Sequence, residues 1–505
     1  MSRKHLSIFL AMLLVSVSIP VVSAAEGTTH YVFEGDDLQS AIDNAAPGDT
    51  IIVGPGEYDI GTLILNKSLT LLGSGAEATI LNGAIRLAMP GARDGGRVTE
   101  EYRHLAGFTI DTSDHPKTAV MTSQEVDAPD SGSERDGESY VYSSISVSDC
   151  FIIAPTGIHV QDAEQASFSG NTVLALRIPV APRDADSGIP PMGIGVEYTT
   201  SVLIQDTVVQ GFYFGIYSFS CNAVTVKNTI SFFNDQTAIY VSGSCASTAT
   251  ITNNTVGMSD NGIECIGGSS AVVANNIIYD CALNLPSSGE LDGKIDTYYD
   301  ARISMSDSIV FAHNDIFHSE RMDEARLDGT TFPPGYSIGL STCVGTLFVY
   351  GNIFEDPLID VEARVTSTGG LDGVGMTYLP SWSFKIAAAS PCKDAGLNAL
   401  PSEFGAVTVD IAGTHRPQNG LFDIGAYELP ASFTPGTMQP LVGTALVNTL
   451  QAWNAVLATL PETPTPDQQA VLDQVQALIE GAGSLGNPIA ALGALQRAMA
   501  LMSSL

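Results

Sequence analysis

The chain has 505 residues, of which 44% are hydrophobic and only 15% charged, and its formal net charge is −34. This length and composition provide ample apolar material for a large core. With 21 basic against 55 acidic residues, the chain lacks the basic footprint that nucleic-acid binding requires, so that class of function is excluded. Seven cysteines are too few for disulfide bonds to stabilise a chain of this length, so the core must supply most of the stability.

Residues 1–24 have the pattern of a secretory signal peptide. Arg3 and Lys4 give a basic start, Leu6 to Val17 form an apolar stretch, and Val22-Ser23-Ala24 offers a small-residue cleavage site. The apolar stretch is short for a membrane span. We therefore expect an extracellular or cell-surface protein with no transmembrane span in its mature chain; an uncleaved anchor is the alternative.

The mature chain begins with a short amphipathic helix followed by strands. Asp37 to Ala45 predicts the helix, with Leu38 and Ile42 on its apolar face. Further along, the alternation of apolar residues and turn residues predicts strands at Thr50–Val53, Thr62–Leu65 and Ser68–Leu72. A helix at this place can cover the open first coil of a repeating β-structure.

A spaced repeat of Asn or Asp, each followed within a few residues by Val, Ile or Phe, dominates the middle of the chain. Its commonest step is 22 residues, and its members are Asp149, Asn171, Asp206, Asn228, Asn254, Asn276, Asn314 and Asn352. Repeats of this length, rich in β-branched residues, are typical of β-solenoids, whose coils stack at about 4.8 Å and bury a continuous core. An Asn at the same corner of each coil can bond to the Asn above and below. We predict an all-β, right-handed parallel β-helix over residues 25–429, with these residues in one corner ladder.

Outward side chains on the same coils suggest a binding surface. Aligning the coils by a Gly-Ile-like step, with Ile or Val pointing inward, gives an outward stripe of His159, Glu197, Tyr217, Tyr240 and Glu264. Tyrosine rings stack on sugar C–H surfaces, and carboxylates bind hydroxyls or act as general acid and base. His159 beside Glu197 could form a proton-transfer pair and is the only catalytic candidate. The alternative is that the stripe consists of ordinary cross-strand pairs.

Two further interactions are suggested by spacing. Cys221 and Cys245 follow equivalent coil positions by six and seven residues, and neighbouring coils lie within disulfide range; free thiols are the alternative. Asp292, Asp296 and Asp300 could share a Ca²⁺ ion, although no calcium-loop pattern surrounds them and turn aspartates are the default. No zinc spacing occurs among Cys and His, and no cofactor is evident.

The last part of the predicted solenoid contains a series of characteristic phrases. They are Ser390-Pro391-Cys392, Asp410-Ile411-Ala412-Gly413 with Arg416-Pro417, and Asp423-Ile424-Gly425-Ala426-Tyr427-Glu428. This series resembles the closing module of exported β-helix proteins, whose sequences end in similar "DIGAYE" phrases. The segment around "LQSAIDNAAPGDTIIVGPGEY" resembles the entry of right-handed parallel β-helix proteins of the pectate-lyase-like superfamily. The two resemblances imply export and surface display, and neither carries a catalytic motif.

Residues 430–505 differ in composition from the solenoid. Leucines at helical spacing, a proline break at Pro461 to Pro466 and a stop near Gly481 predict a unit of about three helices. This unit is a candidate for attachment to the cell envelope.

Two classes of function remain open from the sequence. One is a secreted or cell-surface β-helix that binds, and could modify, a polysaccharide or envelope glycan along an exposed face; an enzyme of this kind would be a polysaccharide lyase or glycoside hydrolase. The other is a non-enzymatic envelope or adhesion protein with the solenoid as a rigid spacer. The missing catalytic signatures favour a non-enzymatic role, whereas the Tyr and Glu stripe favours saccharide contact.

Overall fold

The protein was studied as a computed structural model. It describes residues 27–88, 102–113, 117–123, 142–175, 190–244, 247–281, 299–318, 336, 338–343, 346–359, 384–397, 407–418 and 421–429, with a few residues between 468 and 476. The chain divides into two compact units, Met1–Leu429 and Pro430–Leu505. The predicted signal peptide lies outside the described residues.

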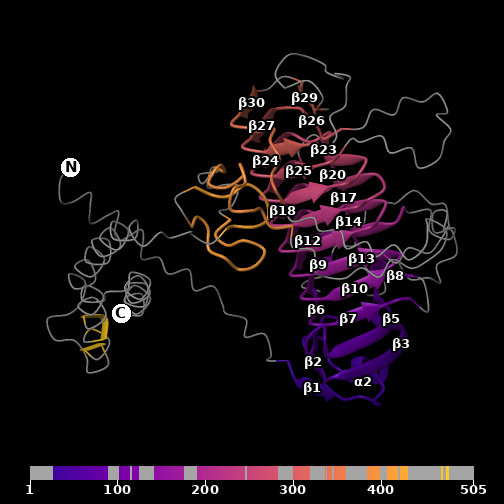
Figure 1. Cartoon of the computed structure of the whole chain (residues 1–505). Coiled ribbons are helices and arrows are strands. Elements are labelled where there is room, and N and C mark those ends of the chain that lie inside the picture. The colour runs from indigo at the N-terminus through magenta and orange to yellow at the C-terminus, as the bar shows by residue number, and fades with distance from the viewer. Residues whose placement is uncertain are drawn as a thin grey trace, which may run out of the picture. The chain divides into compact units, whose positions relative to one another are not determined.

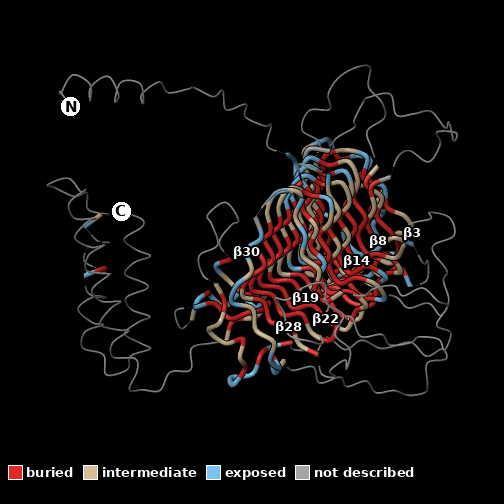
Figure 2. Tube along the Cα trace, turned by 90° about the horizontal axis from the view of Figure 1, so that it is seen from above, coloured by how far each residue is buried: buried red, intermediate tan, exposed pale blue. Residues whose placement is uncertain are grey.

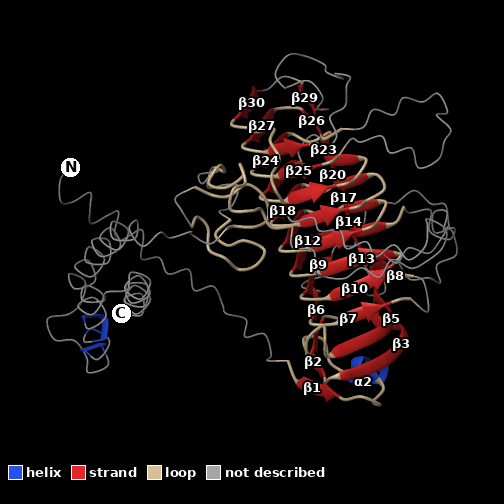
Figure 3. Cartoon of the chain, in the orientation of Figure 1, coloured by secondary structure: helices blue, strands red, loops and turns tan. Residues whose placement is uncertain are grey.

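The described residues between 29 and 350 form a right-handed parallel β-helix, as predicted (Figures 1 and 3). Each complete coil contributes three strands, and every strand pairs in parallel with the equivalent strands of the neighbouring coils. The strands therefore form three stacks. The second and third stacks belong to one hydrogen-bonded sheet, because the long strand β5 pairs with a strand of each.

The first stack is a twelve-stranded sheet. Its strands are β1 (Thr29–Val32), β2 (Thr50–Val53), β4 (Leu69–Gly73), β6 (Tyr102–Ala106), β9 (Tyr142–Ser148), β12 (Ala163–Ser169), β15 (Ser201–Gln205), β18 (Ala223–Lys227), β21 (Thr248–Thr252), β24 (Ser270–Ala274), β27 (Ser308–Ala312) and β30 (Thr346–Tyr350).

The second stack consists of short strands that follow the first corner of each coil. They are β7 (Thr109–Asp111), β10 (Phe151–Ala154), β13 (Thr172–Ala175), β16 (Val208–Gln210), β19 (Ile230–Phe232), β22 (Thr255–Gly257), β25 (Ile277–Tyr279) and β28 (Asp315–Phe317). The third stack contains β8 (Thr118–Ser123), β11 (Thr156–Gln161), β14 (Met192–Glu197), β17 (Phe214–Phe219), β20 (Thr237–Ser242), β23 (Asn261–Ile266), β26 (Ala301–Met305) and β29 (Ile338–Thr342). The long strands are β3 (Gly56–Leu65) and β5 (Thr79–Ala88).

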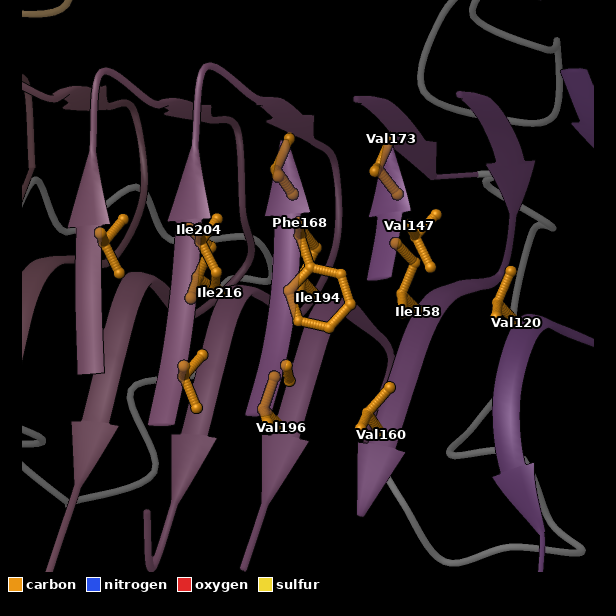
Figure 4. Packing of buried hydrophobic residues seen from close by; sticks show 14 of the residues in the cluster. Val120, Val147, Ile158, Val160, Phe168, Val173, Ile194, Val196, Ile204 and Ile216 are labelled. Carbon is orange, nitrogen blue, oxygen red and sulfur yellow. The ribbon is translucent and has the colours of Figure 1, made fainter. Parts of the chain in front are cut away.

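Inward side chains of all three stacks form one continuous core (Figure 2). Ile158, Ile194 and Ile216 pair in register on successive strands of the third stack and are fully buried (Figure 4). Phe168 and Ile204 of the first stack point into the same interior. Because side chains alternate along a strand, the residues between these positions face outward.

The predicted Asn ladder lies at one corner, but its members occupy two adjacent columns instead of one. In the inner column, Asn254, Asn276 and Asn314 each donate through Nδ2 to Oδ1 of the next Asn at 3.0 Å, and the series ends at Asn352. Asn171 belongs to the same column, where its Oδ1 accepts the N–H of Cys150.

The other three predicted members lie one residue earlier in their coils. Asp149, Asp206 and Asn228 have φ of 53°, 52° and 49°, which is the left-handed conformation that turns the chain at this corner. Asn and Asp suit both positions, since they tolerate the left-handed region and can also bond to neighbouring backbone. Their one-residue offset was therefore invisible in the sequence pattern, and the prediction of a single ladder is wrong for these three residues.

The first coil is covered by α2 (Leu38–Asn44), as the sequence predicts (Figure 3). Asp37 is its N-cap and accepts the N–H of Ser40 at 3.1 Å, which satisfies one of the free donors of the first turn. Leu38 and Ile42 are buried against the first coils. The apolar face of the helix thus replaces the coil that is missing at this end.

The closing module, of which residues 384–397, 407–418 and 421–429 are described, packs against the side of the solenoid. Phe384 contacts Phe232 of β19 at a ring-centroid distance of 4.3 Å, and the N–H of Ala426 donates to Thr255 Oγ1 of β22. Asn275 donates to the carbonyl of Leu397 and accepts its N–H. The module therefore stabilises the outer side of the second stack.

One buried arginine organises this module. Arg416 donates to the carbonyls of Asp423 and Gly425 at 2.9 and 2.8 Å, and its Nη1 lies 3.3 Å from Glu428 Oε2. The same carboxylate accepts the N–H of Asp423. The conspicuous charged residues of the "DIGAYE" series are thus structural.

The second unit is described only at a few helical residues, among which Leu472 and Val475 are buried. The rest of the predicted three-helix unit lies outside the described residues. Within the described part of the chain, no helix is both long and apolar enough to cross a membrane.

Candidate functional site

The strand register changes the predicted stripe on the third stack. Ile158 pairs with Ile194, and Ile194 with Ile216, so the outward column runs from His159 through Gly195 to Tyr217 and Tyr240. The column continues to Glu264 and Arg302. Glu197 is not a member of it, because the segment Gly193-Ile194-Gly195-Val196 contains two Gly-aliphatic steps and the sequence alignment used the second. The error is two residues, so Glu197 still faces outward, one column away.

His159 and Glu197 lie close together diagonally across two coils. His159 Nε2 is 3.7 Å from Glu197 Oε1, and Gln161 Nε2 donates to Glu197 Oε2 at 2.7 Å. Burial acts to raise the pKa of Glu197, but the interactions with His159 and Gln161 outweigh it and the pKa is lowered. His159 is only 3% exposed, beneath the Met192 side chain that fills the space above Gly195. It therefore contacts the Glu197 carboxylate from a buried position.

Tyr217 and Tyr240 stack on one another. Their ring centroids are 5.4 Å apart and their planes differ by 6°. Each ring thus covers a face of the other, and the pair is only partly exposed. Burial, together with nearby Glu197 and Tyr240, raises the pKa of Tyr217 to about 12, so its hydroxyl keeps its proton at neutral pH.

Four more aromatic rings surround this pair. Phe214 lies 5.1 Å from Tyr217 and 5.4 Å from Tyr240, and Phe219 is parallel to Tyr217 at 6.4 Å. Tyr213 packs edge-on against Phe214 at 5.0 Å, and Tyr198 packs edge-on against Phe219 at 5.8 Å. We call the six rings the aromatic cluster: Tyr198, Tyr213, Phe214, Tyr217, Phe219 and Tyr240.

The exposed rings of the cluster are Tyr198 and Tyr213, at 45% and 38% exposure. Both lie in turns that flank the third stack, one just after β14 and one just before β17. Neither belongs to the predicted stripe. A signal for Tyr213 is present in residues 211–219, GFYFGIYSF, which contain five aromatic residues in nine.

Carboxylates lie on the adjoining coils. Glu264 accepts a hydrogen bond from Thr237 Oγ1 at 2.9 Å and lies 3.7 Å from Arg302 Nη1. Burial raises the pKa of Glu264 despite both partners. In the turn before β23, burial and the neighbouring Asp235 raise the pKa of Asp260 to about 6. Exposed rings and buried or half-buried carboxylates thus lie on adjoining coils.

The predicted disulfide is absent, because Cys221 is a free, buried thiol. Its Sγ lies 3.5 Å from the carbonyl of Val196, toward the core. Ala223 pairs with Thr248, so Cys221 precedes the paired strand by two residues and Cys245 precedes it by three. Cys245 itself lies outside the described residues.

No observation on the described residues supports a shared Ca²⁺ site at Asp292, Asp296 and Asp300. Asp300 is fully buried and its Oδ1 is 2.7 Å from His318 Nε2. Asp292 and Asp296 lie outside the described residues. Across the described part of the chain, no three His, Cys, Asp or Glu residues are grouped so that they could hold a metal ion.

The chain is similar to one known protein family and to a solved β-helix structure. Residues 131–295 match a family model described as "NosD: Periplasmic copper-binding protein (NosD)". This is about a third of the chain. Among solved structures, the crystal structure of pectate lyase Pel9A is similar at 12% identity, with coverage of 80% of this chain and 98% of that chain and a TM-score of 0.27. None of the curated proteins matches the sequence.

Proposed function

We propose that this protein is exported and binds a saccharide chain across the aromatic cluster. The predicted signal peptide supports export, and so does the match to a family described as periplasmic. The observation that carries the binding proposal is the pair of half-exposed rings, Tyr198 and Tyr213, each held edge-on by another ring of the cluster. Fixed aromatic faces with few rotatable bonds lose little entropy when a ligand packs on them.

The charge around the cluster narrows the class of saccharide. Glu197 lies near Tyr217, Glu264 pairs with Tyr240 on the next strand, and Arg302 is the cation paired with Glu264. With a chain charge of −34, such a surface repels polyanions. A neutral saccharide, whose hydroxyls can donate to carboxylates, fits this surface better than an acidic polysaccharide.

Copper binding, which the printed family description names, is not part of the proposal. Copper sites in proteins use imidazole, thiolate or thioether ligands brought to one point. The described cysteines other than Cys343 are buried, and no group of three His, Cys, Asp or Glu residues that could hold a metal ion occurs among the described residues. The described His, Cys, Asp and Glu residues therefore do not fit a copper centre.

The proposal is tested by a glycan array probed with residues 25–505. The variant Tyr198→Ala/Tyr213→Ala removes both exposed rings, and Tyr31→Ala is the matched control, since Tyr31 is 64% exposed on β1 of the first stack. We expect discrete hits with neutral glycans that the double variant loses and the control retains. A folded protein that binds no glycan would instead favour the rigid-spacer function.

A further inference from the structure

The end of the solenoid opposite α2 exposes a column of its core. Leu347 of β30 pairs with Ile309 of β27, in a column where Ile309, Ala271 and Ala249 are at most 3% exposed. Leu347 itself is 44% exposed. At the other end, α2 contacts β1, whose inward residue Val32 is only 2% exposed. The inward residues of the first stack are therefore covered at the α2 end and partly exposed at the β30 end.

The terminal strand also presents an open edge with large apolar side chains. Among the described strands, β30 pairs only with β27. Phe348 is 51% exposed and Tyr350 46%. An unpaired strand edge of this kind is a template for another strand, and proteins usually guard such edges with charged residues.

The sequence around this edge is uncharged. It contains no Asp, Glu, Lys or Arg between Asp328 and Glu355, whereas the opposite edge at β1 is closely followed by Glu34, Asp36 and Asp37. In a chain of net charge −34, most surfaces repel a second copy. The uncharged last coil is where two copies can approach with the least repulsion.

We propose that this last coil is a self-association surface, on which two copies join tail to tail with their β30 strands antiparallel. A two-fold axis makes the contact isologous, so the same edge serves both partners and the assembly closes as a dimer. Pairing completes the backbone hydrogen bonds of both edges and covers Leu347 and Phe348 of each copy. Each twelve-stranded first stack then continues into that of the partner.

Sedimentation velocity of residues 25–505 tests the proposal, over concentrations up to about 100 µM. We expect a monomer–dimer equilibrium that tightens between about 20 mM and about 300 mM salt, because salt screens the repulsion between two acidic bodies. Phe348→Asp places two like charges at the contact and should weaken dimerisation at least tenfold. Far-UV circular dichroism and the unfolding midpoint check that this variant folds.

The control places the same change at the opposite edge. Tyr31→Asp lies on β1, at the end covered by α2, and should leave the dimer unchanged. A wild-type chain that stays monomeric at every concentration and salt overturns the proposal. So does a folded Phe348→Asp variant that dimerises normally, or a series of larger oligomers that Tyr31→Asp abolishes, since the latter indicates head-to-tail contacts.

Discussion

Asn276 is bound to Asn314 on the next coil by two hydrogen bonds that share one acceptor. Both its Nδ2 and its backbone N–H donate to Asn314 Oδ1, each at 3.0 Å. Its own Oδ1 receives the same two bonds from Asn254. The side chain thus supplies the acceptor for a buried backbone N–H at the corner, a group that would otherwise lack a partner.

The first prediction concerns this ladder. Asn276→Ala leaves the Asn254 N–H without its acceptor and should lower the free energy of unfolding by about 1–3 kcal/mol. Asn222→Ala is the control, because Asn222 is exposed in the turn before β18 and is not part of the ladder. Urea unfolding compares the two. Equal losses of unfolding free energy in the two variants would show that the buried ladder position does not contribute more to stability than the control position.

The second prediction concerns the module on the side of the solenoid. Arg416→Met leaves the Glu428 carboxylate, which is 1% exposed, without its cation. Breaking a buried pair in this way should cost about 3–5 kcal/mol. Arg302→Met removes an arginine that is 50% exposed and should change stability by less than about 1 kcal/mol. Thermal unfolding of both variants measures the contrast, and a small loss in Arg416→Met would refute the structural role.

The third prediction is a pH dependence from Asp315. Burial raises the pKa of its carboxyl from 3.8 to about 7, and its Oδ2 accepts from Cys392 Sγ at 2.9 Å. The folded state therefore holds this proton more tightly than the unfolded state, so stability falls as pH rises from about 4 to about 7 and changes little above that. Asp315→Asn should flatten this part of the curve and be the more stable form at pH 8.

Urea midpoints at several pH values between 4 and 8 test this effect. Other groups also titrate in this range, so the measured quantity is the difference between wild type and Asp315→Asn at each pH. A difference that does not vary with pH would contradict the prediction.

The sequence was sufficient for the architecture because stacking imposes a period on it. Inward β-branched residues and corner Asn residues recur at each coil, and the helix at residues 37–45 carries its own N-cap signal. It was insufficient where two adjacent positions accept the same residue types. Asp206 and Asn276 look alike in the repeat, yet one turns the chain and the other forms the ladder.

The candidate site was only partly predictable for a related reason. Tyr217 and Tyr240 were found because they follow the periodic Ile positions. Tyr198 and Tyr213 lie in turns, where no period predicts the direction of a side chain, and their ring contacts depend on how neighbouring coils align. Nor does a period predict that the end of the Met192 side chain and the buried His159 ring both lie beside Gly195.

The measurement that tests the saccharide-binding account most directly is a calorimetric titration of the glycan found on the array. Tyr198→Ala/Tyr213→Ala should weaken binding tenfold or more, since each ring contact contributes about 1 kcal/mol. Tyr217→Phe/Tyr240→Phe keeps the stacked pair and should weaken it less. The account predicts this order of affinities with unchanged unfolding midpoints. Unchanged affinity in the folded Tyr198→Ala/Tyr213→Ala variant would contradict it.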